Sequence, residues 1–339
     1  NLPETGRRAT HGPRRPQQHG ARLMRRLSAD VVVIGGGIAG ASTALALARR
    51  GRRVVLLERW LIGAEASGRN AGGVRQQGRL PAEIPLARRA VKIWETLDAS
   101  LGRPTGYRQC GHVYVAENET EMEALAEQHA QERQHGLDSE LISPQQLRAL
   151  APGIAHGLTG AKFCATDGMA DPAQATLAIA QAAEEAGATL FCHQQVTAIG
   201  LSNGRVTHVD TAGLRVDTPM VVNAAGPWAP SVAQLAGVYL PIYPSRLGSI
   251  RTAPLAHQSS VFVQTYAYDF GGAQAPDGTM RLGSGANRHD VNRFTYNRHF
   301  DRATEMRISD KAARIFPALD AGRRWRNFDQ FDWVLNHAA

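Results

Sequence analysis

The sequence predicts an α/β fold in which a parallel-sheet domain is interleaved with a second, antiparallel-sheet domain of α+β type. The first observation is a buried apolar run at 31–34, followed by a glycine turn, a helical pattern at 38–50 and another buried run at 53–58. That order is typical of a right-handed βαβ unit. The second observation is that short apolar runs return at 189–223 and again at 241–283, after a helix-rich segment. The two domains are therefore expected to alternate along the chain.

The segments between these runs carry recognisable helix and turn signals. Helix starts are expected at Asn118, at Ser143 before a proline, and at Asp171 before another proline. The dipeptides 203–204 (Asn-Gly) and 277–278 (Asp-Gly) predict hairpin turns. The expected helices are 81–101, 118–135, 143–150, 171–186 and 303–316, and the remaining expected strands are 107–116, 189–192, 196–199, 206–210, 214–217, 220–223, 241–252, 261–268 and 279–283.

The domain bounds follow from this order of elements. Residues 1–28 are predicted to be a basic, disordered tail, of which 1–23 is interpreted as upstream or cloning-derived sequence, with an organelle transit peptide as the alternative. The nucleotide domain is assigned to 29–80 and 150–235, and the substrate domain to 81–149 and 236–316. The segment 317–339 is interpreted as an atypical, truncated end.

Composition and charge exclude several classes of function. The net charge is +8, but residues 1–27 hold seven arginines against one glutamate, so most of it belongs to the tail rather than to a nucleic-acid-binding face. The chain has no apolar run long enough for a membrane anchor. Its 3 cysteines show no metal-ligand or disulfide spacing. We expect a cytoplasmic protein without a metal, a transmembrane segment or a nucleic-acid partner.

The strongest motif is the Gly35-x-Gly37-x-x-Gly40 turn between the first strand and helix. Each glycine removes a side chain where the turn is tight, where a pyrophosphate approaches, or where helix and strand pack together. Glu58 ends the second strand 23 residues after Gly35. An acid at that spacing binds ribose hydroxyls and disfavours the 2′-phosphate of NADP. The motif predicts dinucleotide binding but does not separate FAD from NAD.

Two later segments make that distinction. The first is the glycine-rich loop 66–76 (ASGRNAGGVRQ), and the second is the strand and turn 221–228 (VVNAAGPW). With the Gly35–Gly40 turn they resemble the family of FAD-dependent D-amino-acid and sarcosine oxidases, which includes glycine oxidase and the β subunits of opine and hydroxyproline dehydrogenases. The resemblance covers about residues 29–285 and implies a Rossmann-like FAD-binding domain.

The resemblance also implies roles for individual residues. The three glycines of the turn would hold the pyrophosphate, and the 67–74 loop would run along the pyrophosphate and the flavin. Val196 would contact the adenine, and Ala225 with Gly226 would form a second close approach to the cofactor. The residues expected to bind FAD are Gly35, Gly37, Gly40, Glu58, Arg59, Ser67, Asn70, Gly72, Gly73, Val74, Val196, Ala225, Gly226 and Trp228.

The expected catalytic residues are Arg75, Tyr266 and Arg281. Arg75 stands where relatives carry a substrate-facing arginine, and a guanidinium can pair with a substrate carboxylate through two hydrogen bonds. Its alternative is a solvated helix arginine. Tyr266 is expected on the wall of the substrate site, although tyrosines on strands more often serve packing. Arg281 lies on a strand expected to face the flavin, where related oxidases use a lysine that helps them react with oxygen.

Together these observations predict an FAD-dependent oxidoreductase that oxidises the C–N bond of an amino acid or secondary amine by hydride transfer to flavin. The substrate is a D-amino acid, an imino acid or an opine-like amine. The residue at 281 favours a dehydrogenase that passes electrons to a partner subunit or a quinone over an oxidase. The alternatives are a non-catalytic flavin-binding subunit or truncated remnant, and an NAD-dependent dehydrogenase.

Overall fold

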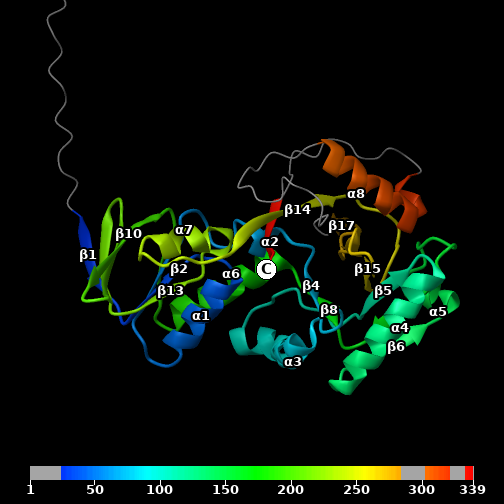
Figure 1. The fold of residues 1–339 in the computed structure, drawn as a ribbon, viewed down its shortest axis with the longest axis horizontal. Helices are drawn as coiled ribbons and strands as arrows, with labels where there is room; N and C mark the ends of the chain where they lie inside the picture. Colours follow the sequence, from blue (N-terminus) through cyan, green and yellow to red (C-terminus); the bar gives the residue numbers. More distant parts are fainter. Residues whose placement is uncertain (1–23, 284–301, 321–332, 339) are drawn as a thin grey trace, which may run out of the picture.

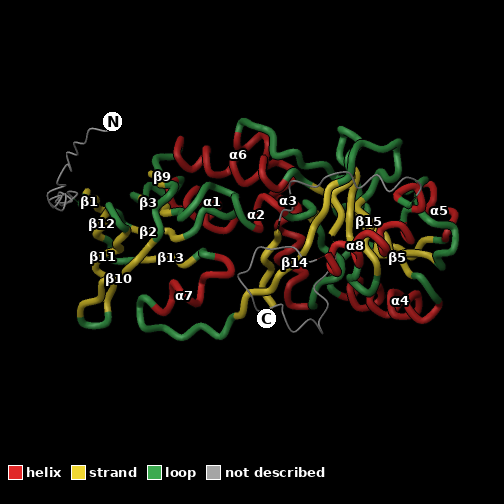
Figure 2. The backbone as a smooth tube through the Cα atoms, turned by 90° about the horizontal axis from the view of Figure 1, so that it is seen from above, coloured by secondary structure: helices red, strands yellow, loops and turns green. Residues whose placement is uncertain are grey.

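The computed structural model describes residues 24–283, 302–320 and 333–338, which form two sheet-centred regions side by side (Figure 1). Figure 2 shows the small parallel sheet at one end of the elongated molecule and the large sheet toward the other. The predicted fold class is confirmed: helices and sheets alternate, and the sheets are built from strands distant in sequence.

The small sheet holds the predicted βαβ unit. Its four parallel strands lie in the order β13 (Val221–Asn223), β2 (Val31–Ile34), β3 (Val54–Leu57) and β9 (Thr189–Phe191). The central strands β2 and β3 read VVVI and VVLL and are buried along their whole length. Continuous apolar runs of this kind are required where both faces of a parallel sheet are covered.

Different layers cover the two faces of the small sheet. Helices α1 (Ile38–Ala48) and α6 (Pro172–Glu185) pack on one face, where their alanines meet alternate valines and leucines of β2 and β3. The other face packs on a second sheet, in the order β1 (Arg25–Ser28), β12 (Leu214–Asp217), β11 (Arg205–Thr211) and β10 (Val196–Ser202). The nucleotide region is thus a three-layer sandwich.

The large sheet has eight strands: β18 (Trp333–Ala338), β14 (Tyr243–Arg251), β17 (Met280–Gly283), β16 (Gly271–Gln274), β15 (Phe262–Thr265), β5 (His112–Ala116), β7 (Gly160–Cys164) and β6 (Glu140–Ile142). All its pairs are antiparallel except β15 with β5. Helices α5 (Pro144–Leu150) and α8 (Arg302–Ile315) cover one face. Helix α4 (Glu119–Gln134) covers the other, against Tyr114 and Ala116.

The remaining elements connect the two regions. They are α2 (Ala66–Arg69), the two-residue strands β4 (Gly73–Val74) and β8 (Gly168–Met169), the turn η1 (Pro81–Glu83) with α3 (Ile84–Leu101), η2 (Gly226–Trp228) with α7 (Ala229–Gln234), and η4 (Pro317–Leu319). Strand β4 pairs with β8. Among the described residues, no helix combines the length and apolar character needed to cross a membrane.

The local signals for helices and turns are confirmed. The side chains of Asn118, Ser143 and Asp171 accept hydrogen bonds from backbone amides in the first turns of α4, α5 and α6. Asn203 and Gly204 both have positive φ, at 50° and 73°, in the hairpin between β10 and β11. Positive φ at both central residues is what a two-residue hairpin turn requires.

Several predicted bounds shift. The predicted strand 107–116 begins only at His112, and the predicted strand 261–268 ends at Thr265. Strand β16 was not predicted, because its sequence GGAQ has no apolar run. The domain division remains a prediction, but two strands lie across its bounds: β1 pairs with β12 although it falls in the predicted tail, and β7 joins the large sheet although it follows residue 150. The rest of the tail, 1–23, is outside the described residues, as are most of 317–339.

Candidate functional site: a dinucleotide cradle beside a buried polar network

The glycine turn is packed so tightly that side chains are excluded. Gly35 has φ of 111°, and a Cβ there would lie 2.3 Å from the carbonyl oxygen of Ala224. A Cβ at Gly40 would lie 1.9 Å from the carbonyl oxygen of Gly35, and one at Gly37 2.8 Å from Oγ of Ser67. Contacts this short do not occur between real atoms, so the turn depends on glycine at these positions.

The turn delivers the N-terminus of α1 to the glycine-rich loop. Gly37 is the N-cap and offers no capping side chain, and Ser67 supplies one instead by accepting from the Ile38 amide at 2.9 Å. The backbone amides and the dipole at a helix N-terminus favour an anion. This end of α1 therefore suits a pyrophosphate, with Ser67 beside it.

Glu58 lies at the end of β3 with only 8% of its surface exposed. Its Oε2 accepts from the Gly36 amide at 2.6 Å, and its Oε1 accepts from the Trp60 amide at 2.7 Å. Each carboxylate oxygen has a second acceptor position. The side chain is thus fixed by the glycine turn and keeps the acceptors that two ribose hydroxyls require.

Arg59 and Trp228 meet beside this turn. The guanidinium carbon of Arg59 lies 3.5 Å from the centroid of the Trp228 ring, and its Nη2 pairs with Glu65 at 3.0 Å. The two residues come from the end of β3 and from η2, which are distant in sequence. Val196, the predicted adenine contact, is buried at the start of β10.

The second predicted close approach meets the first. The Ala224 amide donates to the Ile34 carbonyl at 2.8 Å, which sets β13 beside β2. A Cβ on Gly35 would lie 3.0 Å from Cα of Ala225, and the next residue, Gly226, has φ of 54°. Side-chain-poor backbone therefore surrounds the turn from two directions, which is the cradle that a dinucleotide fits.

The loop predicted to follow the flavin is folded by its own polar groups. Asn70 donates to the Ala66 carbonyl at 3.0 Å and accepts from the Gly72 amide at 2.8 Å. Gly72 has φ of 84°, and a Cβ there would lie 2.2 Å from the Ala170 carbonyl oxygen. Gly73 and Val74 then form β4, and a Cβ on Gly73 would lie 3.3 Å from the Phe262 ring. The loop thus passes from the small sheet to the large one.

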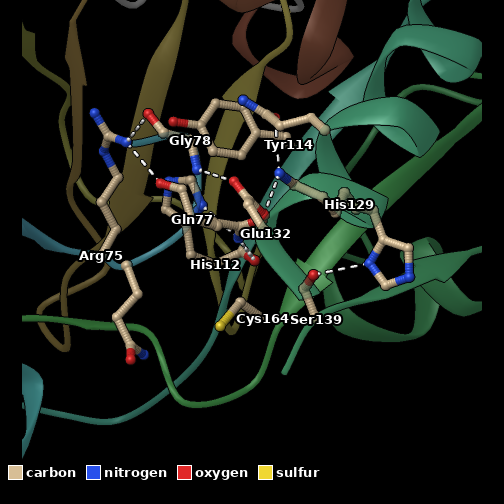
Figure 3. Close-up of polar contacts among 12 residues, drawn as sticks. Arg75, Gln77, Gly78, His112, Tyr114, His129, Glu132, Ser139 and Cys164 are labelled. Atoms are coloured by element: carbon tan, nitrogen blue, oxygen red, sulfur yellow. Dashed lines mark hydrogen bonds and ion pairs between the residues drawn. The ribbon is translucent and has the colours of Figure 1, made fainter. Parts of the chain in front are cut away.

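Arg75 follows this loop directly and lies over two tyrosines. Its Nη1 donates to the carbonyls of Gln77, at 2.8 Å, and Gly78, at 3.1 Å. Its guanidinium carbon lies 5.9 Å from the centroid of the Tyr114 ring and 5.8 Å from that of Tyr268. Figure 3 shows the side chain turned toward Gln77 and Gly78.

The other two predicted catalytic residues have different surroundings. Nη2 of Arg281, on β17, pairs with Asp171 at 3.1 Å. The residue before Asp171, Ala170, donates its amide to the Gly72 carbonyl. Arg281 is thus connected through Asp171 and Ala170 to the loop predicted to follow the flavin. Tyr266 packs against the cluster of Tyr114 and Leu125, and no polar contact joins it to Arg75 among the described residues. Its role in a substrate site stays a prediction.

Sequence reasoning missed a group of buried polar residues below Arg75, which contains Gln77, His112, Tyr114, Glu132, Lys162 and Asp167 and which the half-buried Tyr268 joins through Tyr114. Burial lowers the pKa of His112 well below its ordinary value and raises that of Tyr114, so both side chains are neutral at pH 7. Burial also raises the pKa of Asp167 to about 6. The available signal was polar residues at alternate positions of the apolar segment 112–116.

Burial makes two of the cysteines poor nucleophiles. Burial raises the pKa of Cys110, and it raises that of Cys164 to about 12, so these thiols stay protonated. In the described part of the chain, no three His, Cys, Asp or Glu side chains are grouped so as to hold a metal ion.

The fold and the glycine cradle define a dinucleotide-binding α/β protein. The chain belongs to the DAO family of FAD-dependent oxidoreductases, whose family model matches residues 30–332. The predicted family is confirmed, and the cofactor of this family is FAD, as predicted. The cradle fits it: three glycines exclude side chains at the turn, Glu58 keeps acceptor positions of the kind that ribose hydroxyls require, and the helix terminus suits a pyrophosphate.

The relatives similar to this chain include an enzyme and a regulatory subunit, according to their names. The chain is 31% identical over 270 residues to human mitochondrial sarcosine dehydrogenase, covering 73% of this chain and 29% of that protein. It is 30% identical over 203 residues to the mouse mitochondrial pyruvate dehydrogenase phosphatase regulatory subunit, covering 59% of this chain and 23% of that protein. The chain thus spans less than a third of these relatives. It superposes on the structure of L-proline dehydrogenase from P. horikoshii with a TM-score of 0.80 and 26% identity, covering 94% of this chain and 82% of that one.

Proposed function

We propose that this chain oxidises the C–N bond of an amino acid or a secondary amine, with FAD as the acceptor. The observation that carries the proposal is the position of Arg75, a guanidinium two residues past the β4 glycine of the flavin loop and held by backbone carbonyls. A carboxylate-bearing amine is the substrate that such a cation selects. Relatives named for sarcosine and proline support the same class.

The chemistry requires little of the protein beyond orientation. Bound FAD supplies the hydride acceptor. As the α-hydrogen leaves the substrate carbon with its electron pair, the nitrogen lone pair forms the C=N bond, and water later hydrolyses the imine. The chain's residues bind the substrate carboxylate and orient the α-carbon. Burial keeps the pKa of His112 well below its ordinary value, so this histidine is neutral and does not compete with Arg75 for the carboxylate.

The first test is anaerobic titration of the FAD-reconstituted protein with D-amino acids, proline derivatives and N-methyl amino acids. Loss of flavin absorbance with at least one compound supports the proposal. Arg75→Met should raise KM for that compound roughly 100-fold, because a paired carboxylate loses two charge-assisted hydrogen bonds. Arg53→Met, which breaks the exposed ion pair with Asp30, is the control and should leave KM unchanged.

A non-catalytic flavin-binding subunit is the second candidate. The specific observation that favours it is the similarity to a phosphatase regulatory subunit. A protein that binds FAD but keeps its absorbance with every compound of the panel would support this candidate.

Electron transfer to a partner subunit or a quinone, rather than to oxygen, is proposed on the arginine at position 281. Slow reoxidation by air and fast reoxidation by a soluble quinone would support it.

A further inference from the structure

The segment after Arg75 is confined by two tyrosine hydroxyls. Gly78 has φ of 66°, and a Cβ there would lie 2.5 Å from the Tyr114 hydroxyl and 2.6 Å from that of Tyr268. The Tyr268 hydroxyl donates to the Gly78 carbonyl at 3.1 Å and accepts from the Tyr114 hydroxyl at 3.0 Å. Tyr268 itself has φ of 57°, a left-handed conformation that is strained for a residue with a side chain. A strained backbone at Tyr268 thus accompanies the hydrogen bond that holds the Gly78 carbonyl.

That carbonyl is one of the two that hold Arg75. Nη1 of Arg75 donates to Gln77 and Gly78, so the direction of these carbonyls sets the direction of the guanidinium. None of the hydrogen bonds among the described residues involves the Nε or Nη2 of Arg75. These groups are the edge that a carboxylate can approach.

The same segment is anchored from below by a buried ion pair. The Gly78 amide donates to Oε1 of Glu132 at 2.6 Å, and Oε2 of Glu132 pairs with Nζ of Lys162 at 2.7 Å (Figure 3). The side chains of Glu132 and Lys162 are 2% and 0% exposed. Lys162 also donates to Gln128, so α4 supplies both of its oxygen partners while β7 supplies the ammonium.

A buried ion pair is poor evidence of stabilisation, because desolvation of the two charges offsets their attraction. Burial lowers the pKa of Lys162, and the adjacent Glu132 carboxylate opposes that effect. What the pair does supply is direction: Lys162 holds one oxygen of Glu132 and the Gly78 amide binds the other, so the carboxylate is fixed between the two. Lys162 also lies 5.5 Å from the centroid of the Tyr114 ring that Arg75 contacts. Stability alone does not account for this arrangement.

We propose that Glu132 and Lys162 are positioning residues for Arg75: they fix Gly78, whose carbonyl holds the guanidinium in the orientation that receives a substrate carboxylate. The inference rests on the proposed function. It extends that function to a pair on α4 and β7 that touches neither substrate nor flavin.

The test is a double-mutant cycle on the FAD-reconstituted chain, with acetate as the probe. The dissociation constant for acetate is measured from the change in flavin absorbance, with acetamide as the uncharged control. Glu132→Gln should weaken acetate binding about tenfold or more, because the amide has one acceptor oxygen for two donors: with that oxygen on Lys162, its NH2 group faces the Gly78 amide and releases it. Lys162→Met should do the same from the other partner.

The discriminating arm repeats Glu132→Gln in an Arg75→Met background. If Glu132 acts through Arg75, it should then have no further effect on acetate binding. A purely structural role would weaken binding by the same factor in both backgrounds and would overturn the inference. Lys311→Met, which breaks the half-buried pairs of Lys311 with Glu117 and Asp269, should lower Tm but leave acetate binding unchanged.

Two further arms keep the inference falsifiable. If Glu132→Gln does not fold, the cycle is run with Lys162→Met instead. If it folds, adding Lys162→Met to it should restore acetate binding to within about threefold, because no ammonium then competes with Gly78 for the amide oxygen. If the Arg75→Met variant binds acetate as tightly as the wild type, the inference is overturned. Arg75-dependent acetate binding without flavin reduction by any amine would leave it standing and overturn the proposed oxidation instead.

Discussion

The ionisation of Asp167 is coupled to the fold. Its Oδ1 accepts from the Gln76 amide at 2.7 Å and from Nε2 of Gln76 at 3.1 Å, directly after Arg75. Burial raises its pKa from 3.8 to about 6. Because the folded-state pKa is the higher one, the folded state binds the proton more tightly, and the cost of the buried charge is present above about pH 6 and relieved as pH falls toward 3.8.

Asp167→Asn should therefore remove a pH-dependent contribution to stability. At 1.36 kcal/mol per pKa unit, and with the unfolded carboxyl only partly protonated at pH 4, the wild type should gain about 2 kcal/mol relative to the variant between pH 7.5 and pH 4. Urea unfolding of both proteins at the two pH values measures this difference. Asp277→Asn is the opposite control, since hydrogen bonds from Thr279 lower the pKa of Asp277 and its contribution is lost at acid pH. An equal difference at both pH values would show that Asp167 does not titrate in this range.

The placement of residues could be predicted from the sequence where the constraint is local. The spacing of Gly35, Gly40 and Glu58 reports a turn and the end of the next strand, and the structure brings the three together. The pairing of Lys162 with Glu132 could not be predicted, because the two residues are 30 positions apart in sequence and meet only in the folded chain. Lys162 in the segment GAKFC carries the alternation of a strand and no sign that α4 covers that face.

Helices and strands, too, were predictable where the signal is local in sequence and not where it depends on tertiary packing. The caps of α4, α5 and α6 were predictable because a cap joins residues three apart in sequence. Strand β16 was not, since its sequence GGAQ has no strand pattern of its own and its place is seen only in its pairing with β17. The order of the eight strands likewise depends on tertiary packing, including the parallel contact of β15 with β5.

The β2–α1 unit makes a testable prediction about FAD. Gly40→Ala places a Cβ 1.9 Å from the Gly35 carbonyl, which forces α1 away from the turn and displaces its N-terminus from the pyrophosphate. FAD affinity should fall about 100-fold or more, measured by fluorescence quenching of free FAD. Gly157→Ala is the matched control, since a Cβ there meets nothing within 4 Å and φ is not positive. Equal affinity of the two variants would contradict the role given to the turn.

At the scale of the whole molecule, the loop predicted to follow the flavin is where the two sheet regions meet. Ser249 of β14 donates to the Arg69 carbonyl of α2 at 3.2 Å, Arg281 of β17 pairs with Asp171, and β4 pairs with β8. A ligand that lies along this loop contacts both regions, whereas one confined to Glu58 and the glycine turn contacts only the small sheet. FAD should therefore couple the two sheets.

Hydrogen exchange with two ligands tests this coupling. FAD at 100 times its dissociation constant stabilises the folded state by about 2.7 kcal/mol, so it should slow exchange in β2 and β3 and also in β5 and β15. AMP, which offers only the adenosine half, should protect β2 and β3 alone. Arg53→Met serves as a control and should show the wild-type pattern. FAD that protects only the small sheet would mean that its flavin half does not reach the loop at 70–74, and both the predicted flavin contacts and the proposed role of Arg75 would then fail.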